Sequence, residues 1–317
     1  LFTLKLWKLL EQELIKENLI EHYRRDEIPL VNVLRKMEGR GIAIDLPLLQ
    51  KLSEEISKQL ENEQDLIWES AGEVFNISSP QQLGEVLFGK LQLPHGKKTR
   101  TGSYSTNAAI LEELRWEHPI VDRILSYREL NKLKGTYVDP LPEMIDSKSG
   151  RLHTSFNQTL TATGRLSSAN PNLQNIPIRS EMGSRVRSAF IARDSDHRLL
   201  SADYSQIELR VLAHFSKDPA LIKAYAENAD IHARTASLLF QIPQEMVSEE
   251  QRRQAKAINF GVIYGMSAFR LSKEQGIPLS HAQEFIEQYF SHFSQVQRFI
   301  DDTILSARQN GFITTLY

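Results

Sequence analysis

The sequence predicts an α+β protein that is mostly helical. Apolar residues recur at spacings of three and four through most of residues 1–134 and 205–310, which is typical of amphipathic helices. Between these regions, prolines and glycines interrupt the helical pattern and short segments typical of strands follow. The 317 residues suggest about two domains at roughly 150 residues each. A content of 41% hydrophobic and 25% charged residues excludes a disordered chain.

The overall charge is nearly balanced, with 38 Lys and Arg residues against 40 Asp and Glu residues. Any contact with nucleic acid must therefore come from local basic patches. The chain has no cysteine, which excludes disulfides, Cys-ligated zinc and a Cys nucleophile, and favours a cytoplasmic location. No apolar run reaches the ~18 residues of a membrane-spanning helix, so we expect no membrane contact.

The first half is expected to consist of long helices. Residues 1–38 have a helical pattern, and residues 42–44 form a short extended segment. Asp45 and Pro47 predict the start of a helix that ends near Ser70. Residues 79–82 (SPQQ) predict a second start, with Ser79 as N-cap and Gln82 at the third helical position. Residues 94–107 form a polar, basic loop, and further helices reach about residue 134.

The second half is expected to begin with strands and loops. Residues 152–156 alternate and predict a strand, and residues 164–180, rich in Gly, Ser, Asn and Pro, predict a long structured loop. Residues 199–202 predict a short strand that ends at Asp203. A helical pattern then continues to about residue 310, and residues 312–317 have the pattern of a strand.

The first segment that indicates chemistry is residues 201–210 (SADYSQIELR). A carboxylate between an apolar strand and a helix is well placed to hold a divalent cation, and hard cations such as Mg²⁺ prefer oxygen ligands. The alternative is that Asp203 simply starts a turn. Ser205 and Glu208 also fit the capping-box pattern, so Glu208 has a structural role available.

The second segment is residues 248–265 (SEEQRRQAKAINFGVIYG), where Ser248 and Gln251 predict a capping box and a helix start. On this helix, residues that recur every four positions form a face that is cationic near the N-terminus and aromatic further along. Such a face can hold a triphosphate at one end and a base at the other. The alternative is a solvated basic face above a buried aromatic pair. Gly261, inside the helix, suggests that another group packs close to the backbone. The residues that recur every four positions are Arg252, Lys256, Phe260 and Tyr264.

The third segment is residues 161–177 (TATGRLSSANPNLQNIP), which has one cation, Arg165, many amide and hydroxyl groups, and no acid. This composition suits contacts to phosphates, sugar edges and groove acceptors. A loop rich in Asn and Ser without such a function is the alternative.

Together these segments resemble DNA polymerase family A, the DNA polymerase I family. Residues 203–210 (DYSQIELR) resemble the family's first palm motif, and residues 252–265 (RRQAKAINFGVIYG) the motif on its fingers helix. Residues 163–168 and 171–177 resemble its template-primer contact region, and residues 127–134 (YRELNKLK) and 230–234 (DIHAR) fit as well. The similarity runs from about residue 28 to the last residue, in the family's order.

The resemblance implies a right-hand polymerase architecture with a thumb, a partial palm and fingers. The later His-Asp-Glu palm motif of the family has no counterpart in the chain, so we expect a fragment that is inactive alone. The implied domains are the tail of a preceding exonuclease-like domain (1–38), the thumb (39–135), the first part of the palm (136–214), the fingers (215–310) and the start of the returning palm (311–317).

The resemblance also implies site roles. Asp203 would bind two Mg²⁺ ions together with the Tyr204 carbonyl, and Asp203, Lys256 and Arg252 would carry catalysis. Glu208 would restrict space at the sugar 2′ position. The implied dNTP contacts are Tyr204, Gln206, Glu208, His232, Arg252, Lys256, Phe260 and Tyr264. The implied DNA contacts are Lys97, Lys98, Arg128, Lys132, Arg165, Asn172, Gln174, Asn175 and Arg179.

The function implied is template-directed DNA synthesis in replication and repair, by a monomeric nucleotidyltransferase acting on primer-template DNA and dNTP. A non-catalytic DNA-binding remnant of a polymerase is the alternative from another class. A single-subunit RNA polymerase is a third hypothesis, against which Glu208 argues because it favours deoxynucleotides.

Overall fold

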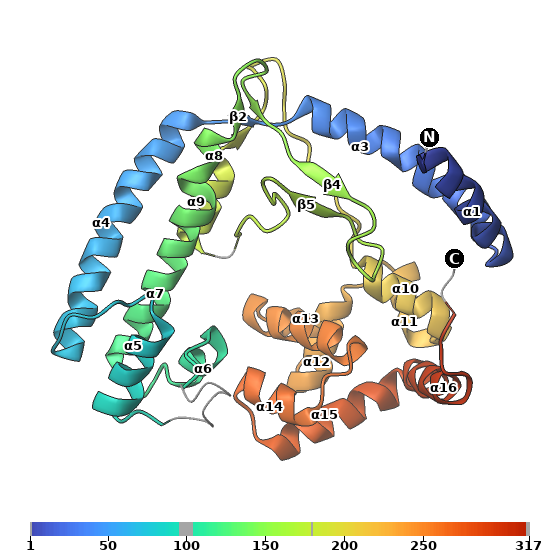
Figure 1. Ribbon diagram of the computed structural model, residues 1–317. Coiled ribbons are helices and arrows are strands. Elements are labelled where there is room, and N and C mark those ends of the chain that lie inside the picture. The colour runs from blue at the N-terminus through green and yellow to red at the C-terminus, as the bar shows by residue number, and fades with distance from the viewer. Residues whose placement is uncertain (1, 95–103, 179, 315–317) are drawn as a thin grey trace. The chain divides into compact units, whose positions relative to one another are not determined.

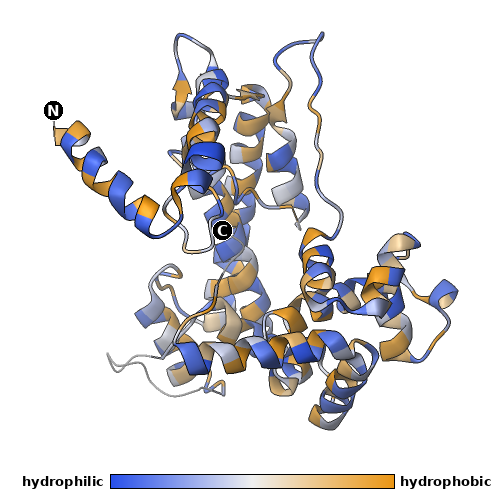
Figure 2. Ribbon diagram, turned by 90° about the vertical axis from the view of Figure 1, so that its right-hand side faces the viewer, coloured by the Kyte–Doolittle hydropathy of each residue, from blue (hydrophilic) through white to orange (hydrophobic). Residues whose placement is uncertain are grey.

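The computed structural model describes residues 2–94, 104–178 and 180–314. The chain forms two compact units, Leu1–Leu200 and Ser201–Tyr317, each with its own core. Helices dominate both units, which confirms the expectation of a mostly helical α+β chain. Figure 2 shows the helices striped with hydrophilic and hydrophobic residues, as expected when one face of each helix is buried.

The first unit is built around two long helices, α4 and α7, which lie side by side (Figure 1). One of its clusters of buried apolar residues includes Leu49 and Ile56 of α4, and the other includes Ile120 of α7. The helices of this unit are α1 (Phe2–Lys16), α2 (Ile20–His22), α3 (Ile28–Arg40), α4 (Leu46–Ala71), α5 (Pro80–Gly84), α6 (Ala108–Glu113), α7 (Pro119–Leu133), α8 (Pro140–Glu143) and α9 (Glu181–Ser188), with π-helical turns η1 (Tyr23–Glu27), η2 (Glu85–Lys90) and η3 (Lys134–Val138).

The ends of α4 follow the sequence signals. The Asp45 side chain accepts a hydrogen bond from the Leu48 amide at 3.0 Å, and Gly72 ends the helix at φ 66°, a conformation that glycine adopts without strain. Ser79 likewise caps α5. Gln82, however, accepts from the Asn76 amide and not from the N-cap amide, so the helix start is confirmed without a reciprocal box.

The strands of the first unit form three antiparallel pairs: β1 with β6, β2 with β3 and β4 with β5. The single strand expected over residues 152–156 is wrong, because Leu152 pairs with Ile145 and Ser155 with Ala169. The chain changes partner at residues 153–154, and the expected 164–180 loop contains β5. The strands are β1 (Ala43–Ile44), β2 (Ile145–Asp146), β3 (Arg151–Leu152), β4 (Ser155–Asn157), β5 (Ser167–Ala169) and β6 (Phe190–Ile191).

In the described part of the second unit every regular element is a helix, and the helices pack around a core that includes Leu221, Ile258 and Phe293. The last helix ends at Asn310, as expected. Residues 312–314 are not in a strand, and residues 315–317 lie outside the described part. The helices are α10 (Ile207–Ser216), α11 (Pro219–Ala226), α12 (Ile231–Phe240), the 3-10 turn η4 (Gln244–Met246), α13 (Glu249–Ile263), α14 (Ala268–Gln275), α15 (Leu279–His292) and α16 (Ser294–Asn310).

The strand expected at residues 199–202 is wrong. The segment has no regular structure, and the Leu200 side chain is 92% exposed. A strand needs a neighbour to receive its backbone hydrogen bonds, and no strand among the described residues pairs with this segment. Asp203 therefore follows an irregular segment and not a strand.

Candidate functional site

The segment that carries Asp203 is held by contacts different from those expected. Gln206, in the left-handed region at φ 54°, precedes α10, and the capping box of Ser205 and Glu208 is wrong because the helix starts one residue too late for it. Instead, the Arg210 Nε donates to the Ser205 carbonyl at 3.0 Å. The Tyr225 hydroxyl donates to Gln206 Oε1 at 3.2 Å, and the Arg210 guanidinium lies 4.5 Å from the centre of the Tyr225 ring.

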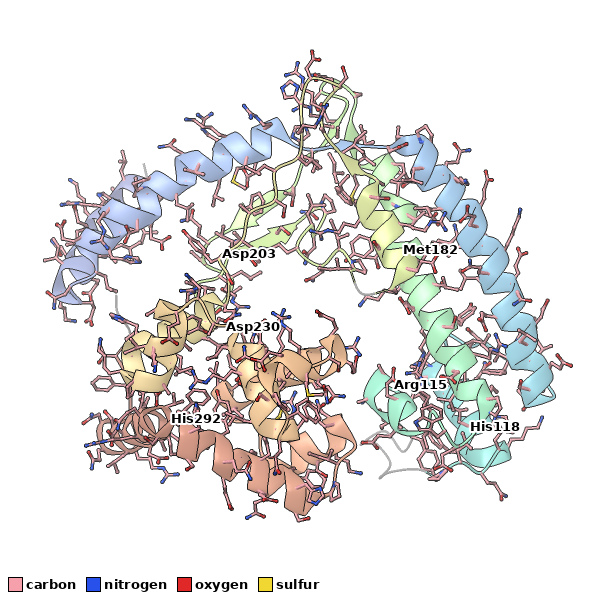
Figure 3. All side chains as sticks on the ribbon, turned by 180° about the vertical axis from the view of Figure 1, so that it is seen from behind. Arg115, His118, Met182, Asp203, Asp230 and His292 are labelled. Atoms are coloured by element: carbon pink, nitrogen blue, oxygen red, sulfur yellow. The ribbon has the colours of Figure 1, made fainter. Side chains whose placement is uncertain are left out.

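A pocket of about 570 Å³ opens beside this segment, within the second unit. Figure 3 labels Asp203, just before α10, and Asp230, just before α12. Carboxylates come to the pocket from the α10 side, and cations come from α13. The lining residues are Asp203, Tyr204, Ser205, Gln206, Ile207, Glu208, His232, Arg252, Lys256 and Phe260.

Helix α13 begins as the sequence predicts, with a complete capping box between Ser248 and Gln251. Its 15 residues carry three of the four predicted side chains, Arg252, Lys256 and Phe260, to the pocket. Tyr264 is the C-cap, 69% exposed, and does not line the pocket.

The expected close approach at Gly261 is confirmed. A Cβ on this glycine would lie 2.2 Å from the Met266 Cε, so the Met266 side chain packs directly on the helix backbone.

The cations of α13 are not equivalent. The Arg252 Nε donates to Asp230 Oδ2 at 2.6 Å, and Arg253 pairs with Glu250 at 2.5 Å. Within the described residues, no hydrogen bond or ion pair engages the Lys256 ammonium group. Lys256 is therefore the uncompensated positive charge that faces the pocket, and an anion there would gain most from it.

Asp230 connects the two helices that face the pocket. Its Oδ1 accepts from the His232 and Ala233 amides and caps α12, while its Oδ2 accepts from Arg252. Burial alone would raise the pKa of Asp230, but the hydrogen bonds from Arg252 and the backbone outweigh burial and lower that pKa. The carboxylate is thus kept charged and fixed.

His232 is 2% exposed, and its Nδ1 lies 3.0 Å from the Asn259 amide nitrogen. The Thr235 hydroxyl donates in turn to Asn259 Oδ1 at 3.0 Å. Burial lowers the pKa of His232 to about 4, and Arg252 and Lys256 lower it further against the opposing effect of Asp230. His232 is therefore neutral at pH 7 and would offer a hydrogen bond rather than a charge.

The metal-binding capacity of the pocket rests on few ligands. Among the described residues, no group of three or more His, Asp and Glu side chains is arranged to hold a metal ion. The Asp203 carboxylate and the Tyr204 backbone carbonyl both belong to residues that line the pocket. This donor set fits Mg²⁺, which is commonly bound through one or two carboxylates plus substrate phosphates and water.

The predicted DNA contacts that are described lie in the first unit. Arg128 donates to the Thr106 carbonyl and, at 3.2 Å, to its hydroxyl, and burial lowers the pKa of Arg128. Its guanidinium thus holds the chain that leaves the basic loop. Lys132 is exposed near the end of α7. Lys97, Lys98 and Arg179 lie outside the described residues.

The polar side chains of the 164–180 loop build the loop itself. Asn172 Oδ1 accepts from the Ser168 hydroxyl and the Gln174 amide, and Gln174 donates to the Leu166 carbonyl. Asn172 and Gln174 therefore have a structural role in the loop, while both residues remain exposed. Asn175 is exposed, and the Arg165 carbonyl accepts from Thr161 at 2.6 Å.

Comparison with known proteins decides the family. The model of DNA polymerase family A matches residues 46–317. The chain belongs to this family. A thermostable DNA polymerase I of Thermus aquaticus is 52% identical over 313 residues, which cover 98% of this family A chain and 37% of the relative. DNA polymerase I of Bacillus subtilis is 47% identical over 307 residues, or 97% of the chain and 35% of that protein.

A solved structure gives the same result for the fold. The POL domain of Pol1 from M. smegmatis, in complex with DNA primer-template and dNTP, matches with a TM-score of 0.90 and 40% identity, covering 99% of this chain and 55% of that one. The mostly helical polymerase fold is thereby confirmed. The family A chain spans little more than a third of the length of the curated relatives that it matches.

Three residues of the family A site were missed from sequence: Asp230 as the partner of Arg252, and Asn259 and Thr235 behind His232. Asp230 had a detectable signal, because an Asp before a helix is a favoured N-cap. Asn259 and Thr235 are 24 positions apart and meet only through the packing of α12 on α13.

In the described ranges no helix is both long enough and apolar enough to span a bilayer.

Proposed function

We propose that the chain is the nucleotide-binding part of a DNA-directed DNA polymerase, a nucleotidyltransferase that adds dNTP to a primer 3′-hydroxyl on a DNA template. The observation that carries the proposal is the pocket that Asp203 and Glu208 line together with Arg252, Lys256 and His232. Family membership and the likeness to a polymerase that binds primer-template and dNTP support it.

The residues divide the nucleotide between them. Lys256 and Arg252 would bind the negatively charged triphosphate, and neutral His232 would donate a hydrogen bond to it. The Phe260 ring, two turns along α13 from Arg252, would stack on the base or sugar. Glu208 and Tyr204 would border the sugar, and Gln206, held by Tyr225, would support this border. Tyr264 does not line the pocket, so any contact of Tyr264 with the nucleotide would be made outside it.

Mg²⁺ is the cofactor that we propose, with Asp203 and the Tyr204 carbonyl as protein ligands and phosphate oxygens completing the site. When bound, it would supply the positive charge that activates the primer hydroxyl and neutralises the leaving pyrophosphate. The protein residues contribute positioning, because phosphoryl transfer depends mainly on alignment and charge.

The first unit would hold primer-template DNA. We propose the thumb at 39–135, the first palm segment at 136–214 and the fingers at 215–310, with residues 1–38 from a neighbouring exonuclease-like domain and 311–317 returning to the palm. The described DNA contacts that we propose are Arg128, Lys132, Arg165, Asn172, Gln174 and Asn175. Arg128, Asn172 and Gln174 also bind within the chain. The enzyme would act as a cytoplasmic monomer in replication and repair.

The test is primer extension by the complete protein that contains this chain, with dNTP and Mg²⁺. Asp203→Asn should abolish extension, because the carboxylate ligand is lost at nearly constant shape. Asp301→Asn, the same change on an exposed residue of α16, is the matched control and should leave extension unchanged. Normal extension by Asp203→Asn would contradict the proposal.

A further inference from the structure

A chain of three buried polar side chains lies behind the pocket. The exposed fractions are 2% for His232, 0% for Thr235 and 1% for Asn259. The Thr235 hydroxyl is 3.0 Å from Asn259 Oδ1, and the Asn259 amide nitrogen is 3.0 Å from His232 Nδ1. His232 lines the pocket, whereas Asn259 and Thr235 do not.

The direction of these hydrogen bonds fixes where the imidazole proton lies. A hydroxyl that donates to the amide oxygen leaves the amide nitrogen to donate onward, since a primary amide has one acceptor end and one donor end. A neutral imidazole that accepts at Nδ1 carries its proton on Nε2. Within the described residues no side chain engages Nε2, so this N–H is available to a molecule in the pocket.

We propose that Thr235 and Asn259 are positioning residues that hold His232 in the Nε2–H tautomer, so that it donates to an oxygen of the nucleotide triphosphate. The inference rests on the proposed function of the pocket. The chemical reason is that a phosphate oxygen without a proton only accepts hydrogen bonds. In the opposite tautomer, Nε2 would present a lone pair to a lone pair of that oxygen.

Charge alone does not supply this specificity. Arg252 and Lys256 attract any anion, but both are cations on long side chains. The His232 ring is packed beside Phe260, with ring centres 5.9 Å apart, and is tied at Nδ1, so its donor points in one direction. Such a fixed neutral donor selects the position of a phosphate oxygen rather than the presence of charge.

The first experiment reads the tautomer directly. The complete protein, labelled with ¹⁵N in histidine, gives two-bond ¹⁵N–¹H correlations that distinguish Nε2–H from Nδ1–H, and His232→Gln assigns the signal. We expect Nε2–H at pH 7 without nucleotide. Nδ1–H would overturn the proposal, because it requires the Asn259 amide in the reverse orientation, with its oxygen against the ring.

The second experiment separates positioning from packing. Thr235→Val removes the hydroxyl at nearly constant shape and should raise the KM for dNTP about fivefold, with a smaller effect on kcat, whereas Thr235→Ser should restore the wild-type KM. Asn259→Asp places an acceptor against Nδ1 and should move the proton to that nitrogen in the spectrum. Equal KM values for the Val and Ser variants would overturn the proposal.

The two readouts keep this inference apart from the proposed function. The tautomer is measured without nucleotide, so Nε2–H in a protein that does not polymerise would support the positioning and contradict the polymerase function. An active polymerase whose His232 carries its proton on Nδ1 would support the polymerase function and contradict the positioning role.

Discussion

The Nε atom of Arg252 lies 2.6 Å from a carboxylate oxygen of Asp230, which joins the first turn of α13 to the N-terminus of α12. The other oxygen of Asp230 caps α12 at the His232 and Ala233 amides. One carboxylate therefore holds the Arg252 side chain and the backbone at His232, and both residues line the pocket. Asp230, which does not line the pocket itself, thus helps to position two residues that do.

Asp230 should contribute to stability through its cap and to nucleotide binding through its charge. Asp230→Ala should lower the free energy of unfolding by about 1 kcal/mol, because two backbone amides lose their acceptor. Asp230→Asn should lower it less, since Asn is an equally good N-cap, yet it should still raise the KM for dNTP through the loss of the Arg252 pair. Denaturant unfolding and primer extension measure the two effects. Equal stabilities for the Ala and Asn variants would contradict the capping role.

The buried His232 should make stability depend on pH. Its pKa in the folded protein is about 4, below the ordinary 6.5, so below pH 6.5 the unfolded chain takes up a proton that the folded protein does not. The contribution of neutral His232 to the free energy of unfolding is therefore complete above pH 6.5 and is lost as the pH falls towards 4. Asp230 stays ionised in this window because its own pKa is lowered.

The check is thermal unfolding of wild type and His232→Gln between pH 7 and pH 4.5. The Tm of the wild type should fall more steeply, while His292, whose pKa burial also lowers, contributes to both proteins alike. Parallel curves would show that His232 titrates normally.

Two tyrosines provide a matched pair in the second unit. The Tyr289 hydroxyl is buried and has no partner among the described residues, and burial raises its pKa. Tyr289→Phe should therefore keep or raise the free energy of unfolding, by about 1 kcal/mol. Tyr225→Phe should lower it by about 1 kcal/mol, because its hydroxyl donates to Gln206. Denaturant unfolding at pH 7 compares them, and a larger loss for Tyr289→Phe would contradict this account.

Glu208 should discriminate between sugars if it borders the nucleotide. Glu208→Ala should lower the preference for deoxynucleotides over ribonucleotides by roughly tenfold or more, because a 2′-hydroxyl would then find space. The measurement is kcat/KM for one dNTP and its ribonucleotide. Glu245→Ala, an exposed glutamate in η4, is the control. Unchanged discrimination would remove Glu208 from this role and reopen the RNA polymerase hypothesis.

Local signals predicted the helices and much of the pocket. Helix α4 and helix α13 both begin at the caps that the sequence indicates, because an N-cap depends on residues a few positions apart. The four-residue spacing likewise placed Arg252, Lys256 and Phe260 on one face, since it follows from the helix period.

Features that depend on distant residues were not predictable in the same way. Residues 199–202 look like a strand, but strand formation requires a partner that the local sequence cannot reveal. Gln206 takes a left-handed conformation before α10, which displaced the expected cap at Ser205. The contacts of Arg252 with Asp230 and of His232 with Asn259 join separate helices, and only the packing of α12 against α13 creates them.

The most direct test of the central claim is the dNTP dependence of primer extension by Lys256→Ala in the complete protein. Lys256 is the pocket cation without a protein partner among the described residues, so its loss should raise the KM for dNTP, or lower kcat/KM, by roughly tenfold or more. Lys273→Ala, on the exposed surface of α14, should behave as wild type. A Lys256→Ala enzyme indistinguishable from that control would show that this pocket does not bind the nucleotide triphosphate.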